Sequence, residues 1–368
     1  MSKLEELIQK LCPNGVVYKR LGDFCRIQTG RGITTKDTTD EGEFPVISGG
    51  LEPMGFYHEY NRHENTVTIA RAGSAGYVNF MYRKFYLNDK CFSVIQLDGT
   101  NPKYLFYALK RIESDIISMK STGSVPTVNT EKVAKIIVPI PPIEVQHEIV
   151  RILDNFTELT AELTAELTAR KKQYEYYRNM LIKEYLDFPL VKLGDVCDVF
   201  TGGEPPEDTI KTDIPSHSHP YAVWGNGKEV YGYSSSYRID KDAVVISSIG
   251  ANTGSVYFHK AFFTPIIRLK VVVPKDNMLD MHYLFHALSA TKIESKSSSV
   301  PNMNASDIKS ILICLPSVSK QKKIAQTLDK FDAYCNDLSI GLPAEIAARQ
   351  KQYEYYRDKL LTFKELKA

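Results

Sequence analysis

The sequence predicts an α+β fold: two tandem mixed α/β domains, related by pseudo-twofold symmetry and separated by two long antiparallel coiled-coil helices. Three observations predict it. The 368-residue chain contains a long internal repeat, each copy opens with short β-rich runs, and each copy ends in a heptad pattern.

The internal repeat runs through most of the chain. KRLGDFCRIQTG at 19–30 recurs as VKLGDVCDVFTG at 191–202, and SVPTVNTEKVAKIIVPIPP at 124–142 aligns with residues 299–317. The segment KQYEYYR is identical at 172–178 and 351–357. Similarity in the same order over this length indicates that one structural unit is encoded twice.

The first part of each copy is typical of strands and loops. Runs such as TVTIA and CFSVIQL, or DAVVISSI and IIRLKVVV in the second copy, alternate with Gly, Ser, Asn and Pro clusters. We expect a globular domain at 1–142, a central spacer helix at 143–186, a second globular domain at 187–314 and a C-terminal spacer helix at 315–368.

After each globular domain, apolar residues recur in alternating steps of four and three, the heptad pattern of a coiled coil. A helix over 143–186 would be ~66 Å long, so its apolar seam needs a partner, and the second helix is the obvious one. Gly341 and Pro343 predict a kink or a helix restart in the second seam. The predicted seams are Ile149, Leu153, Phe156, Thr160, Leu163, Leu167, Arg170, Tyr174, Tyr177 and Leu181, and Ile324, Leu328, Phe331, Cys335, Leu338, Leu342, Ile346, Arg349, Tyr353, Tyr356, Leu360 and Phe363.

The first helix contains its own short repeat. Residues 160–163 and 164–167 are two full Thr-Ala-Glu-Leu units. One more unit would lengthen the helix by ~6 Å and rotate its far end by only ~40°, so the seam would survive. A surface helix rich in good helix formers is the alternative, but a ruler that sets the separation of the globular domains explains the unit length better.

Composition excludes several classes of protein. The net charge of +2 argues against nucleic-acid binding through bulk basicity. Six widely spaced cysteines without a CxxC pair predict reduced, buried thiols rather than disulfides or a zinc site. Since no apolar run approaches the ~20 residues that span a bilayer, and the amino terminus is charged, we expect a cytoplasmic protein.

No catalytic motif is complete. Asn101-Pro102-Lys103-Tyr104 lacks the second proline of the Asn-Pro-Pro-Tyr loop of adenine methyltransferases, and an N-cap followed by proline explains it better. His147-Glu148 lacks the second histidine of HExxH, because Arg151 stands there. Gly225-Asn226-Gly227-Lys228 lacks the spacing of a phosphate loop. We therefore expect no catalytic residue, metal or cofactor on this chain.

Taken together, these residues resemble the specificity subunit of type I restriction-modification enzymes. The resemblance covers nearly the whole chain: two halves that open near Leu-Gly-Asp and end in a Pro-containing run before a long helix, with the Thr-Ala-Glu-Leu repeat as the most specific motif. It implies that each globular domain is a target recognition domain reading one half of a bipartite, asymmetric site in double-stranded DNA. It also implies two methylation subunits docked on the helices, S-adenosylmethionine on those partners, restriction subunits in the full complex, and no catalysis by this chain.

Because the second globular domain carries two more acidic than basic side chains, base reading must be local. Polar, glycine-containing loops are the expected carriers. Arg31 and Arg71 suit guanine and Asn129 suits adenine, although each loop residue could instead satisfy its own turn. The candidate DNA-binding residues are Thr29, Arg31, Thr34, Arg71, Ser74, Ser121, Thr122, Ser124, Thr127 and Asn129 in the first domain, and Thr201, Trp224, Asn226, Lys228, Ser248, Asn252, Ser297, Ser298, Ser299, Asn302 and Asn304 in the second.

The repeated tyrosines predict a partner surface. Tyr176 and Tyr355 fall off the seam, where exposed aromatic residues often mark an interface. Equivalent surfaces on the two copies imply two copies of one partner. Two other functions stay open at this point: a coiled-coil scaffold unrelated to DNA, and a self-contained DNA methyltransferase.

Overall fold

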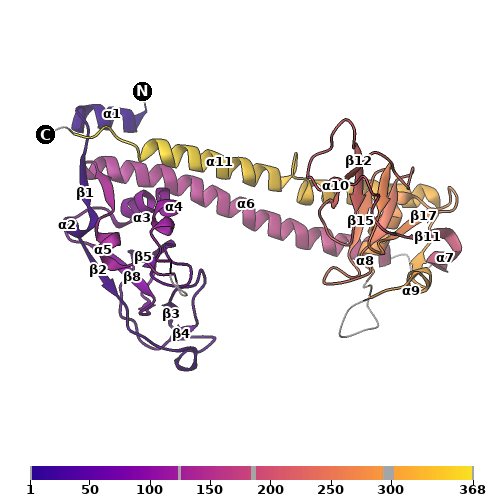
Figure 1. Ribbon diagram of the computed structural model, residues 1–368, viewed down its shortest axis with the longest axis horizontal. Helices are drawn as coiled ribbons and strands as arrows, with labels where there is room; N and C mark the ends of the chain where they lie inside the picture. Colours follow the sequence, from indigo (N-terminus) through magenta and orange to yellow (C-terminus); the bar gives the residue numbers. More distant parts are fainter. Residues whose placement is uncertain (1, 123–125, 184–187, 292, 294–301, 367–368) are drawn as a thin grey trace. The chain divides into compact units, whose positions relative to one another are not determined.

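The computed structural model describes residues 2–122, 126–183, 188–291, 293 and 302–366. The chain divides into two compact units, unit 1 with residues 1–162 and 346–368 and unit 2 with residues 163–345. Each unit therefore contains one copy of the globular part together with segments of both long-helix regions (Figure 1).

Unit 1 contains three small sheets, with strand orders β1-β9, β2-β8-β5-β6 and β4-β3-β7. Its strands are β1 (Val17–Arg20), β2 (Cys25–Thr29), β3 (Phe44–Ile47), β4 (Phe56–Tyr57), β5 (Thr66–Ala70), β6 (Val78–Met81), β7 (Tyr86–Leu87), β8 (Cys91–Gln96) and β9 (Ile137–Ile140). Its shorter helices are α1 (Lys3–Leu11), α2 (Leu21–Phe24), the 3-10 helix η1 (Thr35–Asp37), α3 (Pro102–Arg111), α4 (Glu113–Ser118) and α5 (Thr130–Ala134).

Unit 2 repeats each sheet of unit 1, with orders β10-β18, β11-β17-β14-β15 and β13-β12-β16. Its strands are β10 (Leu190–Lys192), β11 (Cys197–Thr201), β12 (Tyr221–Trp224), β13 (Gly232–Ser234), β14 (Ala243–Ile246), β15 (Val256–His259), β16 (Phe263–Pro265), β17 (Lys270–Pro274) and β18 (Leu312–Cys314), and its shorter helices are α7 (Leu193–Val196), α8 (Met281–Ala290) and α9 (Ala305–Lys309). The same topology occurs twice, which confirms the prediction of tandem mixed α/β domains.

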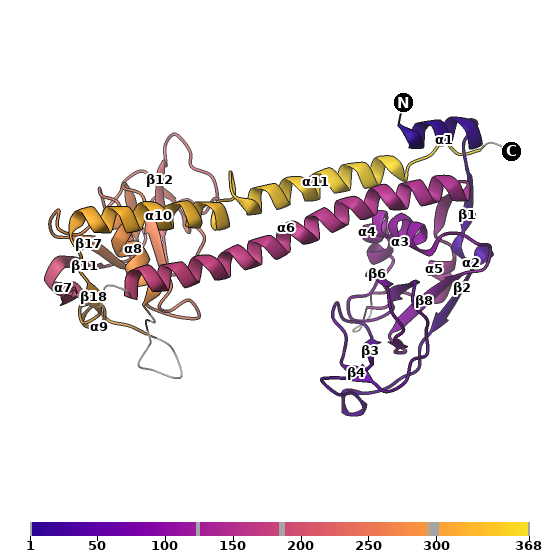
Figure 2. The same cartoon turned by 180° about the vertical axis from the view of Figure 1, so that it is seen from behind.

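The long helices are α6 (Ile143–Lys183), α10 (Val318–Asn336) and α11 (Leu342–Leu360). Both views show α6 antiparallel to α11 within unit 1 and to α10 within unit 2 (Figures 1 and 2). Stacked rings join each pair: Phe156 and Tyr356 in unit 1, with centroids 5.4 Å apart, and Tyr177 and Phe331 in unit 2, 5.8 Å apart. The predicted antiparallel pairing is confirmed within each unit.

The heptad seam is confirmed at most positions and wrong at two. Nearly all predicted seam residues are buried or half-buried, and Tyr174 is only 5% exposed. Arg170 is exposed, and Leu338 is 82% exposed. Leu338 lies outside both helices because α10 ends at Asn336 and α11 begins at Leu342. The second helix therefore restarts, with Pro343 in the first turn of α11, where its missing N–H costs nothing.

A glutamine at the start of each long helix holds the globular part against it. Gln146 accepts a hydrogen bond from the N-cap amide of α3, Asn101, at 2.9 Å. Gln321 accepts one from the N-cap amide of α8, Asp280, at 2.7 Å. Both glutamines are at most 3% exposed. The same junction is built twice because both copies carry glutamine at this position.

An aspartate about two helical turns after each glutamine makes a second junction. The partners of this aspartate differ between the two units. Tyr107 donates a hydrogen bond of 2.6 Å to Asp154 in unit 1. In unit 2, Asp329 lies 2.7 Å from His286 Nε2 and 2.9 Å from His282 Nδ1. Both junctions join the globular part to a long helix, but only that of unit 2 contains histidine side chains.

Two terminal segments of the chain pack onto unit 1. Helix α1 begins with a capping box at Ser2 and places Lys3 3.1 Å from the 4%-exposed carboxylate of Glu148. After α11, Leu361 is fully buried, and the carbonyl of Lys364 accepts a hydrogen bond of 2.9 Å from the amide of Val16. The two termini of the chain thus pack onto the same unit.

All six cysteine side chains are buried, and none forms a disulfide with another described residue. Within the described residues, no helix is both long and apolar enough to cross a membrane. The described His, Cys, Asp and Glu side chains form no group of three that could hold a metal ion.

Candidate nucleic-acid interface

The loops at one end of the four-stranded sheet converge in unit 1. Arg71, directly after β5, donates its amide to the carbonyl of Lys90 (2.8 Å) and accepts at its own carbonyl from the amide of Val128 (2.9 Å). The amide of Ser74 donates to the carbonyl of Gly49 (2.7 Å). We call residues 29–34, 48–52, 71–77, 88–90, 121–122 and 126–129 the first loop face.

Unit 2 builds the same arrangement. The carbonyl of Ser248, two residues after the end of β14, accepts from the amide of Met303 at 2.9 Å, as that of Arg71 does from Val128. Its hydroxyl donates to the carbonyl of Arg268 at 2.6 Å. Residues 201–203, 224–228, 248–255, 266–268 and 302–304 form the second loop face.

Glycines allow the central turn of both faces. Gly73 and Gly76 have φ of +76° and +94°, and Gly250 and Gly254 have φ of +84° and +89°. This left-handed conformation is strained for residues with a Cβ. Equivalent glycines therefore flank both turns, although the turn of unit 2 is one residue longer.

The predicted residues are distributed unevenly over these faces. Thr29, Arg31, Thr34, Arg71, Ser121, Thr122, Asn129, Thr201, Lys228, Asn252, Asn302 and Asn304 are exposed, whereas Ser74, Thr127, Trp224 and Asn226 are half-buried. Ser124, Ser297, Ser298 and Ser299 lie outside the described residues.

Several of these side chains are already committed to the fold. Asn129 and Asn304 are the N-caps of α5 and α9, and their amide oxygens accept hydrogen bonds of 2.9 and 3.0 Å from the helix amides. Thr34 caps η1, with hydrogen bonds to the Asp37 carboxylate. The oxygen of Asn129 thus already accepts one hydrogen bond within the fold, and its contact with adenine stays a prediction.

Ser248 and Asn226 also make hydrogen bonds within the fold. Ser248 is fully buried. Asn226 accepts from the Ser248 amide at 2.7 Å and donates to the carbonyl of Ile267. These bonds tie three loops of the second face together, so Ser248 has no access to a base edge.

Arg31 and Arg71 keep the properties expected of base readers. Both are exposed, and neither guanidinium hydrogen-bonds to another described residue. Beneath them, Arg62 donates to Ser93 Oγ at 2.8 Å and to the carbonyl of Thr29 at 2.9 Å. Burial lowers the pKa of Arg62, and the charge of Arg31 lowers it further. Near the first loop face, the charged Arg62 side chain is therefore held by hydrogen bonds, while the guanidinium groups of Arg31 and Arg71 are exposed.

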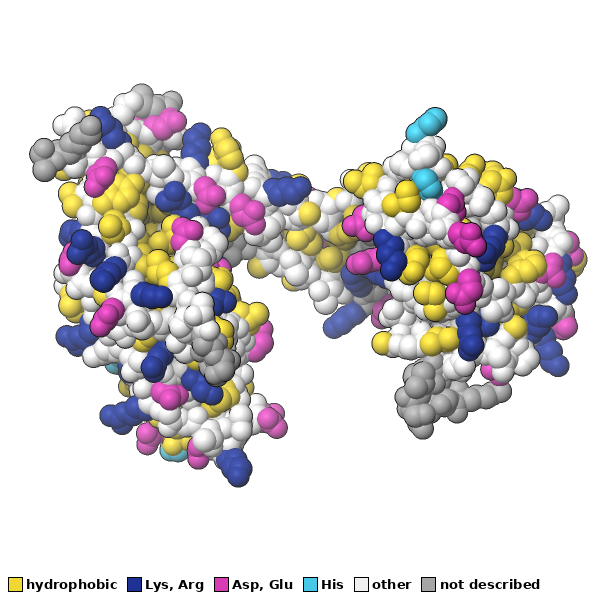
Figure 3. All heavy atoms as spheres, in the orientation of Figure 1, with side chains coloured by type: hydrophobic (Ala, Val, Ile, Leu, Met, Phe, Trp, Pro, Cys, Tyr) yellow, Lys and Arg dark blue, Asp and Glu magenta, His cyan; other side chains and the backbone are white. Residues whose placement is uncertain are grey.

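Two basic residues were missed by the sequence analysis. Lys90 and Arg268 are exposed and each stands two residues before the strand position that pairs with Thr29 or Thr201. Their neighbours, Asp-Lys-Cys and Ile-Arg-Leu, share no letters, so only the strand register reveals the equivalence. Figure 3 shows that such basic side chains are interspersed with acidic ones on the visible faces.

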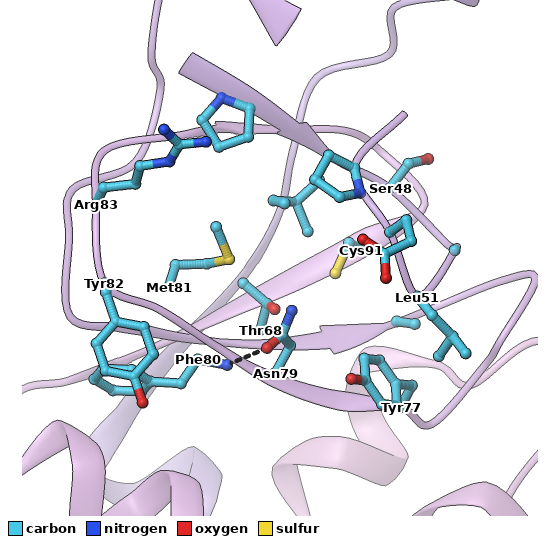
Figure 4. A pocket seen from close by; sticks show the side chains of 16 residues that line it. Ser48, Leu51, Thr68, Tyr77, Asn79, Phe80, Met81, Tyr82, Arg83 and Cys91 are labelled. Carbon is cyan, nitrogen blue, oxygen red and sulfur yellow. Dashed lines mark hydrogen bonds between the residues drawn. The ribbon is translucent and has the colours of Figure 1, made fainter. Parts of the chain in front are cut away.

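A pocket of about 360 Å³ lies beside the first loop face, between β3, β5 and β6 (Figure 4). Met81 and Cys91 form an apolar part of its lining, and Tyr77, Tyr82 and Arg83 line the pocket as well. Burial raises the pKa of the Cys91 thiol to about 12, so it stays protonated at neutral pH and is not a nucleophile. None of the predicted site residues lines this pocket.

The predicted partner tyrosines are exposed and equivalent. Tyr176 is 65% exposed and Tyr355 is 62% exposed. Each ring contacts its neighbour edge-on, Tyr176 with Tyr177 at 5.5 Å and Tyr355 with Tyr356 at 5.3 Å. Each exposed ring is thus held by a neighbour that belongs to the seam.

Comparison with known proteins shows the family. The family model described as the type I restriction modification DNA specificity domain matches residues 13–170 and 185–348. A putative type I specificity subunit of Mycoplasma pneumoniae is 31% identical over 355 residues, which cover 93% of this chain and 96% of that protein. The specificity subunit of a type I restriction enzyme of Escherichia coli is 29% identical and covers 99% of this chain and 97% of its own.

The fold has solved counterparts. The crystal structure of a type I S subunit from M. genitalium has a TM-score of 0.67 at 17% identity and covers 98% of this chain and 99% of its own. A structure from work on the assembly and conformational transition of a type I R-M system has a TM-score of 0.56 at 19% identity, covering 96% and 98%. These comparisons support neither the scaffold nor the self-contained methyltransferase. The chain belongs to the type I restriction-modification DNA specificity family, as a non-catalytic subunit that confers DNA sequence specificity.

Proposed function

We propose that each loop face reads one half of a bipartite, asymmetric site in double-stranded DNA. One observation carries this proposal: the same loop framework occurs twice with different exposed side chains. Arg71 stands where unit 2 has the buried Ser248, and Arg31 follows Gly30 where Gly203 follows Gly202. Base pairs are distinguished by the donors and acceptors they present in the major groove. Different side chains on one framework therefore read different half-sites.

Lys90 and Arg268 supply a contact that both half-sites share. They are basic, exposed and equivalently placed. Such a pair suits phosphate oxygens, which fix the position of a protein on DNA without reading its sequence.

The long helices set the spacer between the half-sites. The two Thr-Ala-Glu-Leu units lie within α6, which is one continuous helix over Ile143–Lys183. Because one unit adds ~6 Å and one base pair ~3.4 Å, an added unit lengthens the spacer by one or two base pairs.

Tyr176 and Tyr355 mark two equivalent docking surfaces, one for each of two methylation subunits. Those subunits bind S-adenosylmethionine and perform the methylation, and restriction subunits join them in the full complex. Equivalent exposed tyrosines on a repeated segment support two copies of one partner. The assembly acts in the cytoplasm.

The test is co-expression of the chain with a methylation subunit, followed by modification sequencing of the host DNA. The expected result is one methylated motif with two different halves and a fixed nonspecific spacer. A single uninterrupted motif, or a motif unchanged when the chain is omitted, would contradict the proposal.

A further inference from the structure

The two stacked pairs between the long helices are the same contact made twice. In the repeat, Phe156 corresponds to Phe331 and Tyr177 corresponds to Tyr356. Phe156 stacks on Tyr356 in unit 1 at an interplanar angle of 21°, and Phe331 stacks on Tyr177 in unit 2 at 25°. Each long-helix region therefore contains one member of each anchor.

The two regions differ in length between these anchors. Tyr177 follows Phe156 by 21 residues, whereas Tyr356 follows Phe331 by 25 residues. The first interval is helical throughout, because it lies within α6. The second region has four surplus residues, the length of one Thr-Ala-Glu-Leu unit.

The surplus lies in the loop between α10 and α11. Cys335 and Leu342 are both buried seam residues, 0% and 3% exposed. Cys335 and Leu342 are seven residues apart, whereas the equivalent Thr160 and Leu163 in α6 are three residues apart. Leu338, which the heptad pattern assigns to the seam, is instead 82% exposed. The loop has thus been excluded from the helix pair.

This loop is an ordered turn. The Asp337 carboxylate accepts a hydrogen bond of 2.7 Å from the amide of Ser339, and the amide of Gly341 donates to the carbonyl of Asp337 at 3.1 Å. A Cβ at Gly341 would lie 2.6 Å from the carbonyl oxygen of Ala333, so the turn folds closely onto the end of α10. The four additional residues thus form a compact turn, and the seam of the second region continues at Leu342.

We propose that residues 338–341 are a length reserve that allows α6 to gain one Thr-Ala-Glu-Leu unit without any change in the second helical region. Insertion of a unit makes both intervals 25 residues long. Residues 338–341 then extend α11 toward α10, with a kink at Pro343, and Leu338 enters the seam. This inference rests on the proposed function of α6 in setting the spacer length. It identifies residues 338–341 as the segment that lets the second helical region match a longer α6.

The experiment compares Leu338→Asp in the full-length chain with and without a Thr-Ala-Glu-Leu unit inserted after Leu167, by thermal unfolding. In the parent, Leu338 is exposed, so the substitution leaves the midpoint unchanged. In the insertion variant a charge would enter the apolar seam, and the midpoint falls by several degrees. Ile340→Asp is the matched control: Ile340 is 79% exposed and lies off the seam, so it is neutral in both backgrounds.

Equal effects of Leu338→Asp in the two backgrounds, or an insertion variant that does not fold, would overturn the reserve. Deletion of residues 338–341 gives a second variant, which folds and keeps the parental DNA spacer; a variant that is unfolded or has a shortened spacer would also overturn it. Modification sequencing of the insertion variant tests the ruler separately. An unchanged spacer together with a background-dependent effect of Leu338→Asp would refute the ruler and leave the reserve in place.

Discussion

Lys90 and Arg268 occupy equivalent positions in the two units and are both basic, whereas the side chains around them differ between the units. Both are exposed, and both precede a strand that pairs with the segment ending at Thr29 or Thr201. The neighbouring Arg71 and Ser248 differ in charge, size and burial. At the scale of single residues, the proposed interface therefore has a basic position that both loop faces share, beside side chains that differ between the two faces.

Lys90→Ala or Arg268→Ala should weaken DNA binding to the same extent for cognate and mismatched sequences, because a phosphate contact carries no base information. Each substitution should also reduce the slope of log K against log salt by about 0.9. Titration of DNA into the complex with the methylation subunits at several salt concentrations measures both. A selective loss of one base preference would show that the side chain reads bases instead.

Two histidines make unit 2 sensitive to acid. Burial lowers the pKa of His286, which contacts Asp329 and Tyr174, and burial lowers the pKa of His259 to about 4. A histidine whose pKa is lower in the folded state contributes stability above its unfolded pKa of ~6.5, and this stability is lost as the pH falls toward the folded value. Tyr107, the unit 1 counterpart of His286, has a pKa raised by burial and stays neutral in this range.

We therefore expect unit 2 to lose stability as the pH falls from about 6.5 to about 4. The single tryptophan, Trp224, stacks on His259 with centroids 4.2 Å apart and reports this unit by fluorescence. His286→Gln should move the transition to lower pH, whereas Tyr107→Phe in unit 1 should leave it in place. A transition that His286→Gln does not move would contradict this assignment.

At the scale of elements, the C-terminal segment is a structural part of unit 1. Leu361 is fully buried within its core, and the carbonyl of Phe363 accepts a hydrogen bond of 2.9 Å from the Tyr18 hydroxyl. Leu366, by contrast, is 44% exposed. The C-terminal segment therefore packs onto unit 1 through a few specific contacts, not through a helix or a strand.

Leu361→Ala should lower the free energy of unfolding by about 2–5 kcal/mol, because it leaves a cavity in the core. Leu366→Ala, the control on the same segment, should stay within about 0.5 kcal/mol of the parent. Chemical denaturation of the full chain measures both. Similar values for the two variants would mean that Leu361 is not part of the core.

Periodic elements could be predicted from the sequence, and irregular ones could not. The repeat predicted the tandem fold and the heptads predicted the long helices, because both patterns are regular in the sequence. The exposure of Leu338 depends on the unequal lengths of two paired regions, and the burial of Ser248 depends on Asn226 and Arg268 from other loops. An exposed asparagine such as Asn129 suits an N-cap and a base contact equally, so sequence alone does not separate these roles.

At the scale of the whole molecule, the chain contains the same fold twice and has a net charge of only +2. Specificity therefore depends on local side chains rather than on overall charge. Both units have the same sheets, the same turn glycines and the same junction glutamines. The differences lie in the side chains of the two loop faces. If each face reads its own half-site, a change on one face must leave the other half unaffected.

The most direct measurement is modification sequencing of DNA from cells that express the Arg31→Ala, Arg71→Ala double variant together with a methylation subunit. Both side chains lie on the first loop face and neither is bonded to another described residue, so folding should be preserved. The predicted result is a motif in which one half has become degenerate, while the other half and the spacer are unchanged. An even loss of specificity across both halves, or an unaltered motif, would contradict the assignment of one half-site to each loop face.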